Sequence, residues 1–189
     1  MTAISTTCKQ SDLRLHLDGA RLFNVLVETN DQPQAIGPLF DSISICLSKG
    51  LGAPVGSVLL GDSATIKRAR KFRKVMGGGM RQAGYLAAAC IYALDNNIPQ
   101  LKKDNLHAAQ IGDQLQELDF VTSVKPVKTN IVIFSILDTL DVSSVLEKFL
   151  EKEIVASQFG PNEIRFVTHN GFDVEDIGQL FSRMKELRF

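Results

Sequence analysis

The sequence has few cysteines, no surplus of charge of either sign and no long hydrophobic run. Its three cysteines, Cys8, Cys46 and Cys90, are odd in number and form no Cys-x-x-Cys pair, which argues against a disulfide framework and against a zinc site. Cys46 and Cys90 lie in apolar runs and are predicted to be small buried hydrophobic residues. Together these features predict a cytoplasmic protein, kept in a reducing compartment, without a metal site.

The charged residues balance, with 21 lysines and arginines against 21 aspartates and glutamates. A net charge of zero argues against a general binder of nucleic acid or of acidic membranes. No run of 18 apolar residues is present, and no basic segment leads into an apolar one at the start of the chain. The sequence therefore predicts neither a membrane span nor a secretory signal.

The size and composition are those of an ordinary globular protein, with 189 residues, 44% hydrophobic and 22% charged. Such a chain can bury most of its unfolded surface without disulfides. No internal repeat or low-complexity tract appears. The texture changes near residue 120, where strand and helix patterns begin to alternate in shorter units. We therefore predict an α/β domain at 1–119 and a small α+β domain at 120–189.

Apolar patterns in the first domain predict three strands, at residues 13–17, 42–47 and 55–60. The third has apolar residues on both faces and is predicted to be buried on both. Helical spacing predicts helices that include residues 20–28 and the basic segment Ser63–Val75, whose six cations form either a solvated face or a binding surface.

The remaining elements follow from the same patterns. Further helices are predicted at 80–96, 101–118, Val142–Glu151 and 174–187, and short strands at 121–127, 130–136, 155–156 and Glu163–Val167.

The segment Ser48-Lys49-Gly50-Leu51-Gly52-Ala53-Pro54 directly follows the second predicted strand. A lysine at the mouth of a buried strand must be desolvated or paired, and desolvation favours its neutral, nucleophilic form. Such an amine can form a Schiff base. Taken alone, a Lys-Gly pair is more often an exposed lysine in a glycine loop. Here the glycines let backbone amides approach an anion closely, which favours Lys49 as a reactive residue.

The segment His16-Leu17-Asp18-Gly19-Ala20-Arg21 ends the first predicted strand in the same way. A carboxylate such as that of Asp18 can hold a proton on a pyridine nitrogen, although an Asp-Gly pair is often only a turn. Arg21 falls in the first turn of the following helix, where it either faces the same pocket or the solvent. His16 is interpreted as a structural strand residue.

Two further arginines are candidates for anion binding. Arg81 follows three glycines and precedes an apolar helix, a setting that suits a phosphate. Arg165 alternates with apolar residues in a predicted strand, so its guanidinium must find an anion, either a substrate carboxylate or an internal salt-bridge partner.

Four motifs in order resemble the low-specificity threonine aldolases: HLDGAR at 16–21, SKGLGAPVGS at 48–57, GGGMRQAG at 77–84 and RFVTH at 165–169. The resemblance runs from about residue 10 to the C-terminus. It implies an α/β fold, namely the C-terminal part of a fold-type-I, pyridoxal-phosphate-dependent large domain with a mostly parallel sheet, followed by a small α+β domain. It also implies a carbon–carbon lyase that cleaves threonine or allo-threonine to glycine and acetaldehyde, with pyridoxal 5'-phosphate as cofactor.

The resemblance assigns a role to each candidate residue. Lys49 would bind the cofactor covalently, and Asp18 would pair with its pyridine nitrogen. Arg21 would lie beside cofactor and substrate, Arg81 would point toward the cofactor phosphate across a subunit interface, and Arg165 would bind the carboxylate of the amino acid.

The resemblance also implies family members nearly twice as long, whose first half carries a glycine-rich phosphate cup and a histidine that stacks on the cofactor. It leaves three readings open. The chain is an aldolase-like lyase, as a homo-oligomer or completed by an N-terminal half; it is an inactive remnant that acts only by subunit association; or it has another fold-type-I activity. The catalytic base and the stereospecificity at the β-carbon stay open as well.

Overall fold

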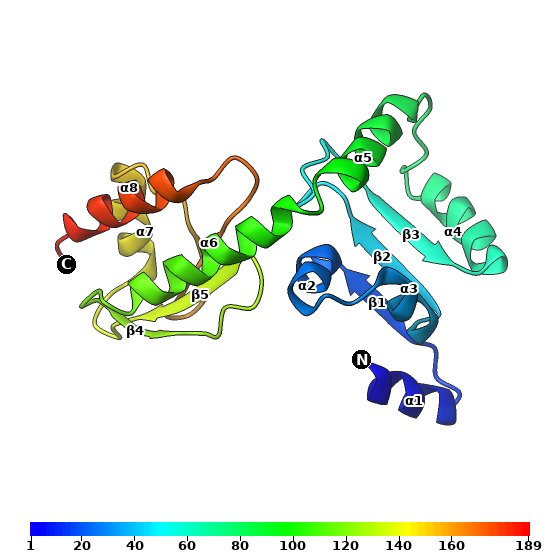
Figure 1. The fold of residues 1–189 in the computed structure, drawn as a ribbon, viewed down its shortest axis with the longest axis horizontal. Helices are drawn as coiled ribbons and strands as arrows, with labels where there is room; N and C mark the ends of the chain where they lie inside the picture. Colours follow the sequence, from blue (N-terminus) through cyan, green and yellow to red (C-terminus); the bar gives the residue numbers. More distant parts are fainter. The chain divides into compact units, whose positions relative to one another are not determined.

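The computed structural model describes residues 1–189, which form two compact units, Met1–Ile98 and Pro99–Phe189 (Figure 1). The long helix α6 (Gln100–Leu115) belongs to the second unit, because it packs into the core of that unit through Ala108, Ile111 and Leu115. The division at residue 120 into a cofactor-binding and a small domain stays a prediction.

The first unit is built on a three-stranded sheet in the order β1-β2-β3. Strand β1 (His16–Gly19) runs parallel to β2 (Ser42–Cys46), and β3 (Ser57–Gly61) runs antiparallel to β2. The parallel pair requires a crossover connection, which the helices between β1 and β2 provide. The carboxyl ends of β1 and β2 consequently meet at one edge of the sheet.

The first unit also contains several helices. They are α1 (Thr2–Gln10), α2 (Leu22–Thr29), α3 (Pro33–Ile36), the short 3-10 helix η1 (Gly37–Leu39), α4 (Ser63–Val75) and α5 (Gly84–Asn96). The small core forms where Leu22 and Leu26 of α2 pack with Ile36 and Ile43. No helix of the chain is long and apolar enough to cross a membrane.

The prediction that the third strand is buried on both faces is wrong. Val58, Leu59 and Leu60 of β3 are 41%, 40% and 43% exposed. The strand lies at the edge of the sheet, and its faces are only partly covered by other elements. The apolar pattern correctly indicated a strand, but apolar side chains become buried only where another layer covers them.

Two of the cysteines also differ from expectation. Cys46 and Cys90 are half-buried rather than buried. Each makes a weak polar contact: Ser57 Oγ lies 3.4 Å from Cys46 Sγ, and Cys90 Sγ lies 3.6 Å from the Val55 carbonyl oxygen.

The second unit contains an antiparallel sheet in the order β4-β5-β7-β6, with α6, α7 (Val142–Glu151) and α8 (Val174–Lys185) packed against it. Its strands are β4 (Val121–Val124), β5 (Ile131–Ile136), β6 (Ser157–Gly160) and β7 (Glu163–Val167). Alternate residues of β5, namely Val132, Phe134 and Ile136, point into the core. The strand expected at 155–156 begins two residues later, at Ser157.

Candidate functional site

Lys49 stands in a loop that is fixed by its own backbone. Leu47 N–H donates to the Gly56 carbonyl at 3.0 Å, Ala53 N–H donates to the Leu47 carbonyl at 3.0 Å, and Gly52 N–H donates to the Lys49 carbonyl at 2.8 Å. Leu47 and Leu51 are buried, whereas the Lys49 side chain is exposed and no hydrogen bond or ion pair reaches its ammonium. The fold therefore holds the loop and leaves the amine available.

A contact that sequence reasoning missed ties this loop to α5. The amide of Asn97, at the C-terminal end of α5, donates to the Leu51 carbonyl at 2.8 Å. Gly52 adopts φ +74°, a conformation that glycine reaches at little cost. An asparagine so far along the chain from the loop carries no sequence signal that would have indicated this contact.

Asp18 lies on β1, opposite Ser44 of β2 in the parallel register. Its carboxylate is exposed, and Oδ1 accepts a hydrogen bond from Ala20 N–H at 3.2 Å. Lys49 follows β2 by three residues, and the carboxyl ends of parallel neighbours lie at the same edge. The structure thus brings Asp18 and the Lys49 loop to one edge of the sheet.

Gly19 explains why β1 and β2 approach closely there. A Cβ atom at this position would lie 2.6 Å from the Ser44 carbonyl oxygen, far inside contact distance. At the start of β1, His16 Nδ1 lies 2.8 Å from Ser42 Oγ across the same strand pair. This contact supports the interpretation of His16 as a structural residue.

Arg21 is half-buried and occupies the N-cap position of α2, directly after β1. It therefore shares the edge with Asp18 and Lys49. Arg81 is exposed in the segment that joins α4 to α5, and α5 begins at Gly84 rather than at residue 80. No hydrogen bond or ion pair joins Arg81 to Asp18 or Lys49.

Arg165 belongs to the second unit, on β7, where its neighbours Ile164 and Phe166 point into the core. The Arg165 Nε atom is buried and has no hydrogen-bond partner, and no carboxylate forms an ion pair with the guanidinium. The aromatic ring of Phe159 lies 5.9 Å from the guanidinium carbon. An internal salt bridge, one of the two predicted alternatives, is absent, so this cation has capacity for an external anion.

Buried polar residues that sequence reasoning also missed fix the end of β7. Thr168 Oγ1 donates to the Asp104 carbonyl of α6 at 2.6 Å, and the Asn130 amide donates to the Thr168 carbonyl at 2.6 Å. Both bonds are buried, where an unmade hydrogen bond is costly. They hold the RFVTH segment, and with it Arg165, against α6 and β5.

Comparison with known proteins decides the family. The sequence model of the family described as Beta-eliminating lyase matches residues 1–139. The chain belongs to the β-eliminating lyase family. Its predicted resemblance to threonine aldolases is confirmed as well, because several curated relatives of this β-eliminating lyase chain carry that name.

Two such relatives illustrate the similarity. The chain is 40% identical over 172 residues to the low specificity L-threonine aldolase of Escherichia coli K12, covering 91% of this chain and 50% of that protein. It is 47% identical over 133 residues to the low-specificity L-threonine aldolase of Candida albicans, covering 70% of this chain and 35% of that protein. The chain spans about half the length of the curated relatives it matches, or less.

Solved structures support the fold. A protein from Exiguobacterium sp. 255-15, described as an aromatic amino acid beta-eliminating lyase/threonine aldolase, aligns with TM-score 0.78 and 25% identity over 98% of this chain and 55% of that chain. The threonine aldolase of Leishmania major aligns with TM-score 0.73 and 23% identity over 97% of this chain and 55% of that chain. The predicted fold-type-I α/β class is confirmed.

Proposed function

We propose that this chain carries the catalytic lysine of a pyridoxal-phosphate-dependent lyase that cleaves threonine or allo-threonine to glycine and acetaldehyde. One observation carries the proposal: the unpaired amine of Lys49 and the exposed carboxylate of Asp18 lie at the same edge of two adjacent parallel strands. The similarity to E. coli K12 low specificity L-threonine aldolase supports the choice of reaction.

The residues of the chain fit pyridoxal phosphate and an amino acid. The cofactor has an aldehyde, a pyridine nitrogen and a phosphate, which call for an amine, a carboxylate and cations. Lys49 and Asp18 provide the first two. The unpartnered Nε of Arg165 calls for an anion, which a substrate carboxylate would supply. When bound, the cofactor supplies an electron sink for the carbon–carbon cleavage.

Each side chain then has a distinct task. Lys49 attaches the cofactor through its amine, and Asp18 keeps a proton on the pyridine nitrogen through its negative charge. Arg21 contacts the cofactor and substrate from the start of α2. Arg81 binds the cofactor phosphate. Arg165 orients the substrate by gripping its carboxylate with two parallel hydrogen bonds.

The proposal includes a further chain as partner. The exposed edge strand β3 and the exposed apolar face of α5, where Tyr85 is 89% exposed, are surfaces that proteins normally cover. We propose that a second copy, or a chain supplying the remainder of the relatives' length, covers them. We propose the cytoplasm as the compartment of this reaction.

Borohydride trapping tests the role of Lys49. The chain is incubated with pyridoxal phosphate, reduced, digested and analysed by mass spectrometry. We expect the cofactor on the peptide that contains Lys49, and no fixation in the Lys49→Ala variant. The Lys71→Ala variant, which removes an exposed lysine of α4, should be labelled like the parent. Labelling spread over surface lysines, or absent at saturating cofactor, would contradict the assignment.

The family description favours a second candidate reaction, β-elimination. The two reactions differ in their products. Retro-aldol cleavage of threonine yields acetaldehyde and glycine, whereas elimination from serine yields pyruvate and ammonia. Cofactor-loaded protein is assayed with both substrates; pyruvate without acetaldehyde would replace the aldolase proposal by an eliminating lyase.

A further inference from the structure

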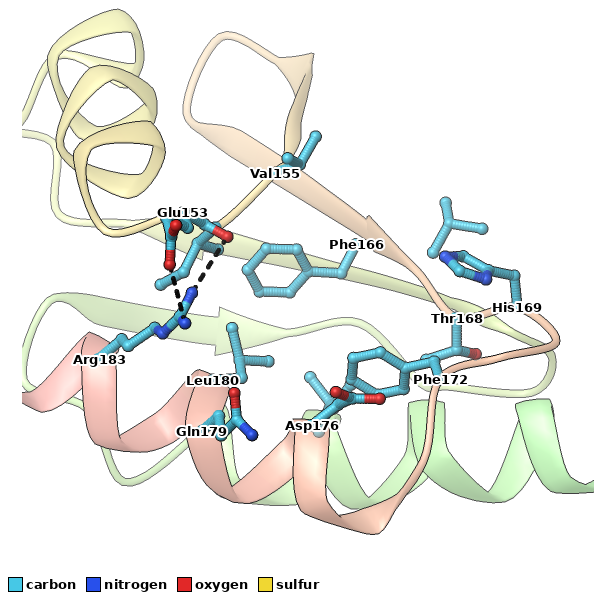
Figure 2. A pocket seen from close by; sticks show the side chains of 13 residues that line it. Glu153, Val155, Phe166, Thr168, His169, Phe172, Asp176, Gln179, Leu180 and Arg183 are labelled. Atoms are coloured by element: carbon cyan, nitrogen blue, oxygen red, sulfur yellow. Dashed lines mark hydrogen bonds and ion pairs between the residues drawn. The ribbon is translucent and has the colours of Figure 1, made fainter.

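A cavity of about 270 Å³ lies in the second unit, between α8 and the end of β7 (Figure 2). Apolar side chains from three elements form its floor: Ile111 of α6, Phe166 of β7 and Leu180 of α8. Successive side chains along a strand point to opposite faces of the sheet, so Arg165 and Phe166 of β7 lie on opposite faces. The cavity is therefore separate from the guanidinium assigned to the substrate carboxylate.

At one end of the cavity, the guanidinium of Arg183 forms an ion pair with Glu153. Arg183 Nη2 lies 2.9 Å from Glu153 Oε2, and Arg183 Nη1 donates to the Lys152 carbonyl at 3.1 Å. Figure 2 shows this pair at the side of the cavity away from His169. Because the guanidinium already has a carboxylate partner, this end offers little to an anionic ligand.

The other polar groups present unused hydrogen-bond acceptors. Asp176 Oδ2 accepts the Asp173 N–H at 2.8 Å in the capping box of α8, whereas Asp176 Oδ1 has no partner. His169 Nδ1 lies 2.9 Å from the Asn170 carbonyl oxygen. A carbonyl oxygen can only accept, so Nδ1 carries a hydrogen, and Nε2 is an acceptor in the neutral form of the ring.

We propose that this cavity binds a small apolar primary amine. The ammonium donates to Asp176 Oδ1, and the hydrocarbon part packs on Phe166 and Leu180. Glu153, Arg183 and Asp176 together carry one net negative charge, which complements a single ammonium. The small volume limits the hydrocarbon to a short chain.

The experiment uses the chain of residues 1–189 without pyridoxal phosphate, so that its outcome is independent of the proposed lyase activity. Isoamylamine is titrated into isotopically labelled protein and followed by NMR, with isovalerate as the matched acid. We expect the amine to shift the backbone amides of Thr168, His169 and Leu180 saturably, and the acid to leave them unchanged. Equal binding of isovalerate, or amine-induced shifts confined to the first unit, would overturn the proposal.

Two variants separate a specific site from general attraction of cations. Asp176→Asn removes the charge but keeps an oxygen that can accept the Asp173 N–H, so the helix cap is retained. It should weaken amine binding about tenfold or more. Glu175→Gln removes a neighbouring exposed charge and should change the affinity less than about twofold. An unchanged affinity in Asp176→Asn, with the fold intact by circular dichroism, would refute the site.

Discussion

Gly19 sets the spacing at which Asp18 and the Lys49 loop meet. Because Gly19 has no side chain, the Ser44 carbonyl oxygen can lie only 2.6 Å from the point that a Cβ atom of residue 19 would occupy. Backbone atoms of a paired strand cannot move aside without breaking the ladder. The residue thus serves the site although it bears no chemical group.

We expect Gly19→Ala to destabilise the chain by about 1 to 3 kcal/mol, the usual cost of inserting an atom into a filled space. Urea unfolding monitored by circular dichroism measures the change. Gly84→Ala is the matched control, because a Cβ atom there meets nothing within 4 Å; it should be neutral or slightly stabilising. Similar losses in both variants would show that strand spacing is not the cause.

The sequence singled out Asp18 and Lys49 because each follows an apolar run, and their roles stay predictions. That their strands are parallel neighbours is seen only in the structure. Asn97 was missed because its partner, the Leu51 carbonyl, is a backbone group far away in the chain. The cavity was missed for a similar reason, since its lining joins the RFVTH segment to residues of α6 and α8 that are distant in the sequence.

At the scale of elements, α4 begins with a charged cap. Asp62 accepts hydrogen bonds from Thr65 N–H at 2.7 Å and from the Thr65 hydroxyl at 3.0 Å. These bonds, the backbone one first, hold the pKa of Asp62 below its ordinary value of 3.8. The ionised carboxylate therefore stabilises the fold above that value, and the stabilisation is lost as the pH falls through the lowered pKa.

We expect Asp62→Ala to lower the urea midpoint at neutral pH, and the difference from the parent to shrink well below pH 3.8. Asp62→Ser keeps a capping oxygen without a titrating group, so it should retain part of the stability with less dependence on pH. A constant difference between Asp62→Ala and the parent across this range would contradict a role for the ionised cap.

Element boundaries show where local sequence suffices. The helices Ser63–Val75 and Val142–Glu151 and the strand Glu163–Val167 were predicted at their observed bounds. The helix and strand patterns are complete within these segments. The burial of β3 was predicted wrongly because burial depends on what lies against a strand, which its own residues do not specify.

At the scale of the whole molecule, the two units differ in how well they cover their apolar residues. The second has a continuous core beneath its sheet, whereas the first exposes the apolar residues of β3 and much of α5. Contiguous exposed apolar surface favours association.

We expect the purified chain to self-associate with rising concentration, and Leu59→Lys to reduce this by placing a charge on the open edge of β3. Light scattering after size-exclusion chromatography gives the mass. Leu150→Lys alters a leucine of α7 in the second unit that is 65% exposed and serves as the control. If Leu150→Lys lowers the mass and Leu59→Lys does not, the interface belongs to the second unit.

The division at Ile98 and Pro99 has a consequence for how the protein is made. Each unit consists of one uninterrupted stretch of sequence, and neither sheet borrows a strand from the other stretch. During translation, every strand that β1 and β2 pair with has emerged before α6 is synthesised. The lysine loop and its aspartate can consequently assume their places while the ribosome is still adding the residues that will hold Arg165.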